Sequence, residues 1–304
     1  MNFKNRHSDC LFSKKTLDSE VSVMWLVGVL TVSLLAVYCW FQKLQKNNNQ
    51  LKMQFEQIMM LRQLIEFIRY HRRFCHQKLV HPSKNVEFDE SVNVKTHIMK
   101  ETLTALIHQA ESNHKPMFRI LRKEIQSLLT ECHEYNLQRS QAVHGRIIRH
   151  IMYLIDDVMS MALLNSEKKH AFKQYQTAWP IILNSLDNLQ RFRWMIEHYP
   201  IKSSIYQRDL KINIKMIQRR LGQIQMLSLQ HPPTWPIEKL LTNFQAHSFE
   251  THDEKGLREG LYGYSFQVSD TIFQYFDLIL ADIADELAIE APSLTACLAD
   301  HDCS

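Results

Sequence analysis

Glycine and proline are scarce in this chain, with six and eight residues among 304. β-Sandwiches, barrels and doubly wound sheets need many tight turns, where these two residues are favoured. Alternation of apolar and polar residues is nowhere long enough to indicate a strand. The sequence therefore predicts an all-α protein.

Features of nucleic-acid binders and of disulfide scaffolds are also missing. The chain has no phosphate-binding glycine loop and no zinc-finger spacing, and a net charge of +4 is too small to indicate a nucleic-acid partner. The cysteines form no C-x-x-C pair and are too sparse for a disulfide framework. We therefore expect unpaired, buried thiols at all six positions: Cys10, Cys39, Cys75, Cys132, Cys297 and Cys303.

Basic residues are absent after Arg258, while nine acidic residues follow it. This last stretch also carries apolar residues at helical spacing from Phe266 to Leu287. We therefore expect an acidic helix packed against basic helices, not a free acidic tail.

The longest uncharged run covers residues 21–40. Twenty helical residues match the hydrocarbon layer of a bilayer, which is about 30 Å thick. The run ends in Tyr38, Cys39 and Trp40, with the two aromatic residues as interface anchors in place of the small residues of a signal-peptide cleavage site. The sequence therefore predicts one transmembrane helix that anchors the chain in the bilayer.

Basic residues flank this run on both sides and do not by themselves decide its orientation. Four precede it and three follow it: Lys4, Arg6, Lys14, Lys15, then Lys43, Lys46 and Lys52. Translation from Met24 instead of Met1, which the sequence leaves open, would place all of them on the C-terminal side. We expect a single-pass protein of the inner (cytoplasmic) membrane with its soluble region in the cytoplasm.

The remainder of the chain has the periodicity of about seven helices separated by short breakers. We predict helices over residues 49–80, 91–110, 116–138, 146–164, 181–199, 203–230 and 263–290, with breaks at Gly145 and Pro180. The resulting division is an N-terminal segment (1–20), a transmembrane helix (21–40), a helical sensor-like bundle (41–290) and a C-terminal tail (291–304).

Three patterns suggest catalysis or metal binding without completing a site. Two Glu-x-x-His pairs, at residues 111–114 and 167–170, have the spacing of di-iron ligands, but adjacent lysines indicate solvated helix ends. His71 and Cys75 lie one helical turn apart, which suits two ligands of one metal, but a third ligand is not evident. Cys75 also has no acidic residue nearby to orient a catalytic base. We therefore expect no enzyme activity, no metal and no cofactor.

Two arginines occupy core positions of their helices. Arg72 continues the apolar stripe between Ile68 and Cys75, and Arg193 continues the stripe from Leu189 to Ile196. A buried guanidinium needs an anionic partner, since an unpaired buried charge costs several kcal/mol. That partner is either a carboxylate of the acidic last helix or a small planar anion, whose oxygens match the guanidinium fork. Arg69 and Arg149, at the stripe edges, are additional candidate ligands.

Residues 64–79, LIEFIRYHRRFCHQKL, resemble the opening helix of the nitrate- and nitrite-sensing domain family. Helices of that family carry an acidic residue or His, then Arg, Gly, an apolar residue and Ser or Thr. His71 to Cys75 occupy these places, with the arginine retained at Arg72 and the Gly and Ser replaced by Arg73 and Cys75. Residues 143–162 and 183–196 are similar to two further helices of the family.

The resemblance implies an all-helical sensor that binds nitrate or nitrite between helices through arginines and passes a helix movement to an output module. We expect that output on a separate signalling protein, because only fourteen residues follow Glu290. The alternative hypothesis is a membrane-tethered structural or protein-interaction bundle without a small ligand. The expected partners are thus a small anion, the lipid bilayer and a signalling protein, and a homodimer is one open arrangement.

Overall fold

The computed structural model describes residues 6–81, 90–166, 168–198, 204–226 and 254–289. These residues form seven α-helices and a short 3₁₀-helix and contain no strand, which confirms the all-α prediction. The helices are α1 (Arg6–Val80), α2 (Glu90–Gln109), α3 (Lys115–Glu131), η1 (Cys132–Glu134), α4 (Leu137–Ser166), α5 (Lys169–His198), α6 (Ser204–Gln225) and α8 (Glu254–Glu286).

The chain divides into two units, Met1–Leu51 and Lys52–Ser304. In the first unit, the large apolar side chains described between Trp25 and Phe41 are exposed. No helix among the residues searched is both long and apolar enough to cross a membrane. Six side chains of the predicted span, at residues 21–24, 26 and 27, lie outside the described set. The transmembrane helix therefore stays a prediction.

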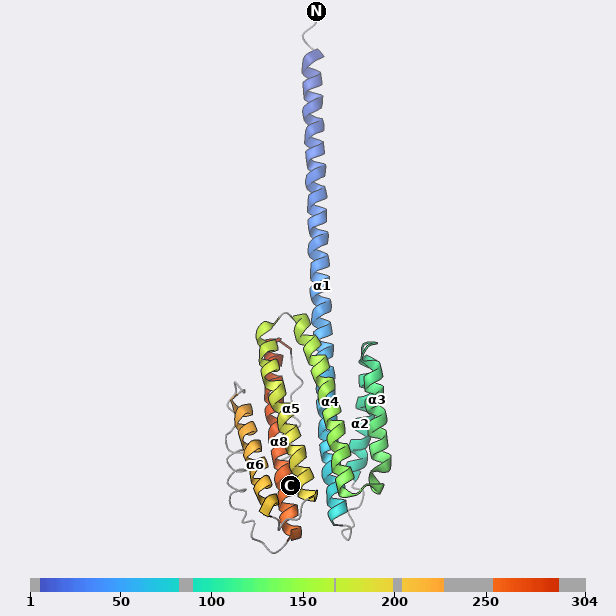
Figure 1. Cartoon of the computed structure of the whole chain (residues 1–304). Helices are drawn as coiled ribbons and strands as arrows, with labels where there is room; N and C mark the ends of the chain where they lie inside the picture. Colours follow the sequence, from blue (N-terminus) through green and yellow to red (C-terminus); the bar gives the residue numbers. More distant parts are fainter. Residues whose placement is uncertain (1–5, 82–89, 167, 199–203, 227–253, 290–304) are drawn as a thin grey trace, which may run out of the picture. The chain divides into compact units, whose positions relative to one another are not determined.

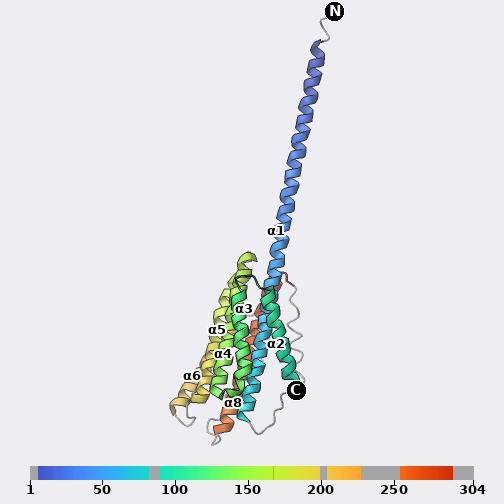
Figure 2. The same cartoon turned by 90° about the vertical axis from the view of Figure 1, so that its right-hand side faces the viewer.

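The second unit is a bundle in which α5 packs against α4, α6 and α8, and α3 packs against α2 and α4 (Figure 1). Residues 52–80 of α1 run antiparallel to α8, because Arg62 pairs with Asp277 while Arg69 pairs with Asp270. Figure 2 shows α2 and α3 beside this part of α1 and α4, and Gln57 of α1 donates to the Gln109 carbonyl at the end of α2.

The core follows the predicted apolar stripes. The five seam residues of α6 are buried, as are those of α8 from Phe273 onward: Leu210, Ile214, Ile217, Leu221 and Ile224, then Phe273, Phe276, Leu280, Ile283 and Leu287. The acidic last helix is therefore docked in the bundle, as expected.

Two predicted breaks are wrong. Helix α4 continues through Gly145, where the missing side chain allows a close approach: a Cβ there would lie 2.6 Å from Gln190 Oε1 of α5. Helix α5 continues through Pro180, with Trp179 and Ile182 buried on either side of the exposed proline. Packing on both sides outweighs the backbone preference of the single proline.

Two helix boundaries also differ from the prediction. Helix α3 ends at Glu131, not near residue 138, and α4 begins after Asn136, whose side chain accepts a hydrogen bond from the Arg139 N–H at 2.8 Å. Such a contact is a typical N-cap. Helix α8 begins at Glu254, nine residues before its predicted start.

Candidate functional site

Five arginines gather where α1, α5 and α8 meet. Four come from α1 and one from α5, and we name them the arginine cluster: Arg62, Arg69, Arg72, Arg73 and Arg193. All are buried except Arg73, whose side chain is one-third exposed. The spacing along α1 explains the arrangement, because residues three or four apart share one face of a helix.

Arg62 has carboxylate partners on two helices. Its Nε and Nη2 donate to the two oxygens of Asp277 in α8, at 2.6 and 2.7 Å, and Nη2 also lies 2.7 Å from Glu66 of α1. Burial opposes the charge of Arg62, but Asp277 and Glu66 hold its pKa above the ordinary value. This bidentate pair is a strong, geometrically specific link between α1 and α8.

Arg69 and Arg73 share one carboxylate. Both donate to Asp270 of α8, and Arg69 also donates to Glu66. The guanidinium of Arg69 also lies over the ring of Phe273, 4.6 Å from its centroid. The acidic last helix therefore supplies carboxylate partners, as the sequence suggested. It supplies them to Arg62, Arg69 and Arg73.

Arg72 has no such partner. Its side chain is 2% exposed, no carboxylate lies within ion-pair distance among the described residues, and its buried Nε has no hydrogen-bond partner there. Burial and then the charges of Arg193 and Arg69 lower the pKa of this guanidinium far below its ordinary value. The inward position predicted for Arg72 is confirmed.

Arg193 is also buried and contacts only neutral acceptors within the described part of α8. Its Nε donates to Ser265 Oγ at 3.1 Å and its Nη2 to the Ser265 carbonyl at 3.0 Å. Burial and then the charge of Arg69 lower its pKa to about 9, so Arg193 is charged at neutral pH. Its predicted inward position is confirmed as well.

His76 completes the neighbourhood of these two arginines. It follows Arg72 by one turn, and its buried Nδ1 has no hydrogen-bond partner among the described residues. Burial and the charges of Arg193 and Arg72 lower its pKa to about 4, so the ring is neutral at physiological pH. Its ring packs against Tyr262 and Phe266 of α8, with centroids 4.3 and 5.5 Å apart. We name Arg72, His76 and Arg193 the candidate anion site.

The charge balance of the cluster is positive. Five guanidinium groups face three carboxylates within the described residues, Glu66, Asp270 and Asp277, which leaves an excess of two positive charges. Arg149, the fourth candidate ligand from the sequence, lies elsewhere: it pairs with Asp187 at the exposed contact between α4 and α5. The structure therefore places Arg69, Arg72 and Arg193 together but not Arg149.

Arg62, Ser265 and His76 were not predicted from the sequence as members of this site. Arg62 follows Ile58 by four residues, and His76 follows Arg72 by four, so an extended stripe would have included both. No sequence signal distinguishes Ser265 from the other hydroxyl residues of α8, because its role depends on how α5 and α8 are aligned.

A second polar group lies on another side of α1. His71 and Cys75 of α1 face Cys132 of η1, and the potential ligand atoms of these three residues lie within 4.8 Å of one another. His144 of α4 reaches the same place, with its Nε2 2.9 Å from His71 Nδ1. Cys132 is thus the potential third ligand that the sequence did not reveal. The histidines of the two Glu-x-x-His pairs have partners outside this group, with His114 near Asp157 and His170 bonded to Glu286, and Glu167 lies outside the described residues.

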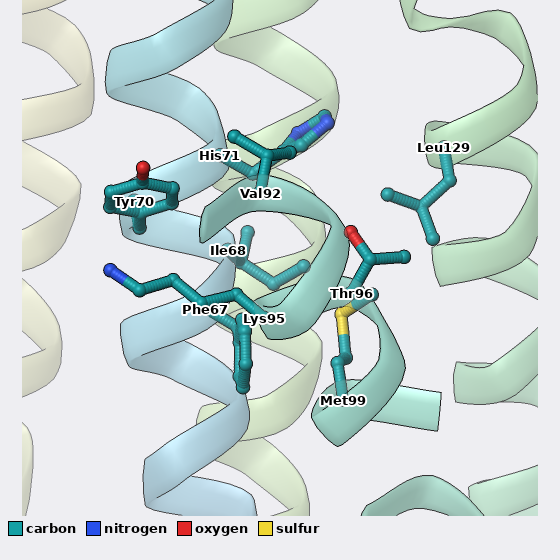
Figure 3. A pocket seen from close by; sticks show the side chains of 9 residues that line it. All are labelled: Phe67, Ile68, Tyr70, His71, Val92, Lys95, Thr96, Met99 and Leu129. Atoms are coloured by element: carbon teal, nitrogen blue, oxygen red, sulfur yellow. The ribbon is translucent and has the colours of Figure 1, made fainter. Parts of the chain in front are cut away.

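His71 also borders a small pocket among α1, α2 and α3 (Figure 3). Its cavity volume is about 10 Å³, which is room for about one water molecule. The lining is mainly apolar, with Val92 and Met99 on α2 and Leu129 on α3. This pocket is too small for a polyatomic anion and does not include the arginines.

Comparison with protein-family models, with curated proteins and with solved structures found no match for this chain.

Proposed function

We propose that this protein is a membrane-anchored helical binding protein for a small inorganic anion, and that it signals through a separate partner. The observation that carries the proposal is Arg72, a buried guanidinium that lacks a carboxylate partner among the described residues. The candidate anion site, Arg72, His76 and Arg193, is the proposed ligand-binding site. Nitrate and nitrite are the first ligands to test, on the basis of the family resemblance of residues 64–79.

The buried positive charge of Arg72 has no partner of opposite charge within the described residues, and this has an energetic cost. Isolated charges inside a protein cost several kcal/mol each, and this cost is repaid only by a partner of opposite charge. Arg72 Nε and His76 Nδ1 are buried without a partner in the described part of the chain. A flat, singly charged anion would accept a hydrogen bond from Arg72 Nε and, when the neutral ring carries its proton on Nδ1, from His76, and it would reduce the positive excess of the cluster. Such an anion is also weakly hydrated, so its own desolvation is less costly.

Membrane anchoring is part of the same proposal. A single helix, α1, contains both the uncharged run of residues 21–40 and Arg72. Large exposed apolar side chains such as Leu30, Leu34 and Trp40 support burial of this run in lipid. We place the second unit in the cytoplasm, where a signalling partner would detect an anion-dependent shift of α1.

A melting screen of the full-length chain in detergent tests the anion proposal. Nitrate, nitrite, chloride and sulfate are compared at constant ionic strength. A specific ligand at about 100 times its dissociation constant stabilises the fold by about 2.7 kcal/mol, which raises Tm by roughly 5–10 °C for a domain of this size. We expect such a shift with nitrate or nitrite, its loss in Arg72→Met, and its retention in Arg149→Met.

The second candidate function is a tethered structural or interaction bundle without a ligand. The ion pairs of Arg62, Arg69 and Arg73 with α8 favour it, because they show that internal carboxylates satisfy much of the cluster. Equal shifts with all four salts, or a nitrate shift that survives in Arg72→Met, would decide for this function.

A further inference from the structure

Two cysteines and two histidines lie together on the other side of α1, apart from the candidate anion site: His71, Cys75, Cys132 and His144. We propose that His71, Cys75 and Cys132 bind one thiophilic metal ion of the Zn²⁺ class, with His144 as the positioning residue behind His71. The three ligands come from two elements far apart in the sequence, α1 and η1, and their potential ligand atoms all lie within 4.8 Å of one another.

The spacing of the ligand atoms fits tetrahedral coordination. Zinc lies about 2.3 Å from thiolate sulfur and about 2.0 Å from imidazole nitrogen, which places sulfur and nitrogen about 3.5 Å apart and two sulfurs about 3.8 Å apart. Cys75 Sγ lies 3.7 Å from His71 Nδ1 and 3.9 Å from His71 Nε2. The pair on α1 already has this spacing, and the three ligand atoms lie within 4.8 Å of one another, so a contraction of at most about 1 Å would form the site.

The hydrogen bonds behind His71 set the tautomer that a metal ligand needs. His144 Nδ1 lies 2.6 Å from the Ser140 carbonyl, which can only accept, so Nδ1 is the donor. His144 Nε2, 2.9 Å from His71 Nδ1, is then the acceptor, so His71 carries its proton on Nδ1. The lone pair of His71 Nε2 is left on the ring edge that coordinates. Metal-bound histidines typically donate their second N–H in this way.

The ligand set selects the class of metal. Two thiolates and one imidazole favour Zn²⁺ or Cu⁺ over Mg²⁺ and Ca²⁺, which prefer oxygen ligands. Three protein ligands leave a fourth coordination position for a water molecule. Binding replaces the thiol protons of Cys75 and Cys132, which are released to solvent.

Cobalt(II) titration of the reduced, chelator-treated, full-length chain tests this site, because Co²⁺ bound to thiolate gives charge-transfer and tetrahedral d–d absorption. We expect saturation at one Co²⁺ per chain, displacement by Zn²⁺ and no displacement by Mg²⁺. The spectrum should be lost in Cys75→Ser and in Cys132→Ser. His144→Gln should retain the spectrum but bind about 10- to 100-fold more weakly, as expected when the hydrogen bond that orients a metal-bound histidine is weakened.

Cys39→Ser is the matched control, because Cys39 is an exposed thiol in the first unit. It should bind Co²⁺ like the wild type. Circular dichroism verifies the fold of each variant, and Cys132, only partly buried in η1, is the less disruptive of the two ligand positions. A wild-type chain without charge-transfer absorption would overturn the proposal, as would a spectrum that persists in folded Cys132→Ser.

Discussion

Buried arginines in this protein fall into two kinds that differ in what surrounds the guanidinium. Arg62 donates to both oxygens of Asp277, whereas Arg72 has no carboxylate partner among the described residues. Removing one member of a buried ion pair leaves the other charge unpaired, while replacing an unpaired charge by an apolar side chain removes a cost. The two kinds therefore predict opposite effects of the same substitution.

Arg62→Met should lower the free energy of unfolding by about 3–5 kcal/mol, because Asp277 would stay buried without its partner. Arg72→Met, in nitrate-free buffer, should leave stability unchanged or higher. Denaturant unfolding of both variants and the wild type measures the difference. A large loss of stability in Arg72→Met without any anion would mean that Arg72 has an internal partner and would support the structural function.

Helices α4 and α5 remain continuous through residues that usually interrupt helices. Pro180 lies inside α5 and is exposed, while Trp179 and Ile182 are buried. The proline cannot donate to the carbonyl four residues earlier, and its ring crowds that turn. Burial on both sides of Pro180 keeps the helix formed.

Pro180→Ala should raise stability by up to about 3 kcal/mol, since it restores a helical hydrogen bond and removes little buried surface. Thermal unfolding followed by circular dichroism gives the change in Tm. A lower Tm in the variant would show that the proline contributes to packing or to the bend of α5, contrary to this account.

Periodicity was sufficient to predict the helical class, the end of α1 before His81, the proline at the start of α3 and the seams of α6 and α8. It was not sufficient at Gly145 and Pro180, because contacts with other helices decided there against the local preference. The inward positions of Arg72 and Arg193 were predictable from their stripes. Their lack of carboxylates was not, because it depends on the register between α1, α5 and α8.

The same limit applies to the thiol and imidazole cluster. His71 and Cys75 were recognisable from their spacing of four residues. Cys132 lies 57 positions beyond Cys75, and only the packing of η1 beside α1 brings the two together. Sequence spacing identifies ligands on one helix, whereas ligands from different elements require the tertiary fold.

At the scale of the whole molecule, the proposed lipid anchor and the proposed binding sites belong to different units of the chain. Residues 21–40 carry no charge, and a charged residue at the bilayer centre costs about 2.5–3.5 kcal/mol on insertion scales. The second unit, Lys52–Ser304, contains the arginine cluster and the proposed metal site. Anchor and sites can therefore be tested separately.

The full-length chain should remain in the membrane pellet after alkaline carbonate extraction if residues 21–40 span the bilayer as proposed. A Leu30→Arg and Leu34→Arg double variant should be extracted, while substitution of two exposed residues of the second unit, Ile212 and Met216, by arginine should not alter the result. A reporter fused after Ser304 should be active in the cytoplasm. Extraction of the wild type would show that residues 21–40 do not anchor the chain in the membrane. Activity of a periplasm-dependent reporter would show that the orientation is the opposite of the one proposed.

Direct binding of nitrate is the measurement that tests the central claim most closely. Isothermal titration of the full-length chain with nitrate, at constant ionic strength, should give a saturable heat with one site per chain. The heat should disappear in Arg72→Met and Arg193→Met and persist in Arg149→Met, whose arginine pairs with Asp187 outside the cluster. The absence of saturable heat for nitrate and nitrite in the wild type, or equal binding by wild type and Arg72→Met, would contradict the proposed anion site.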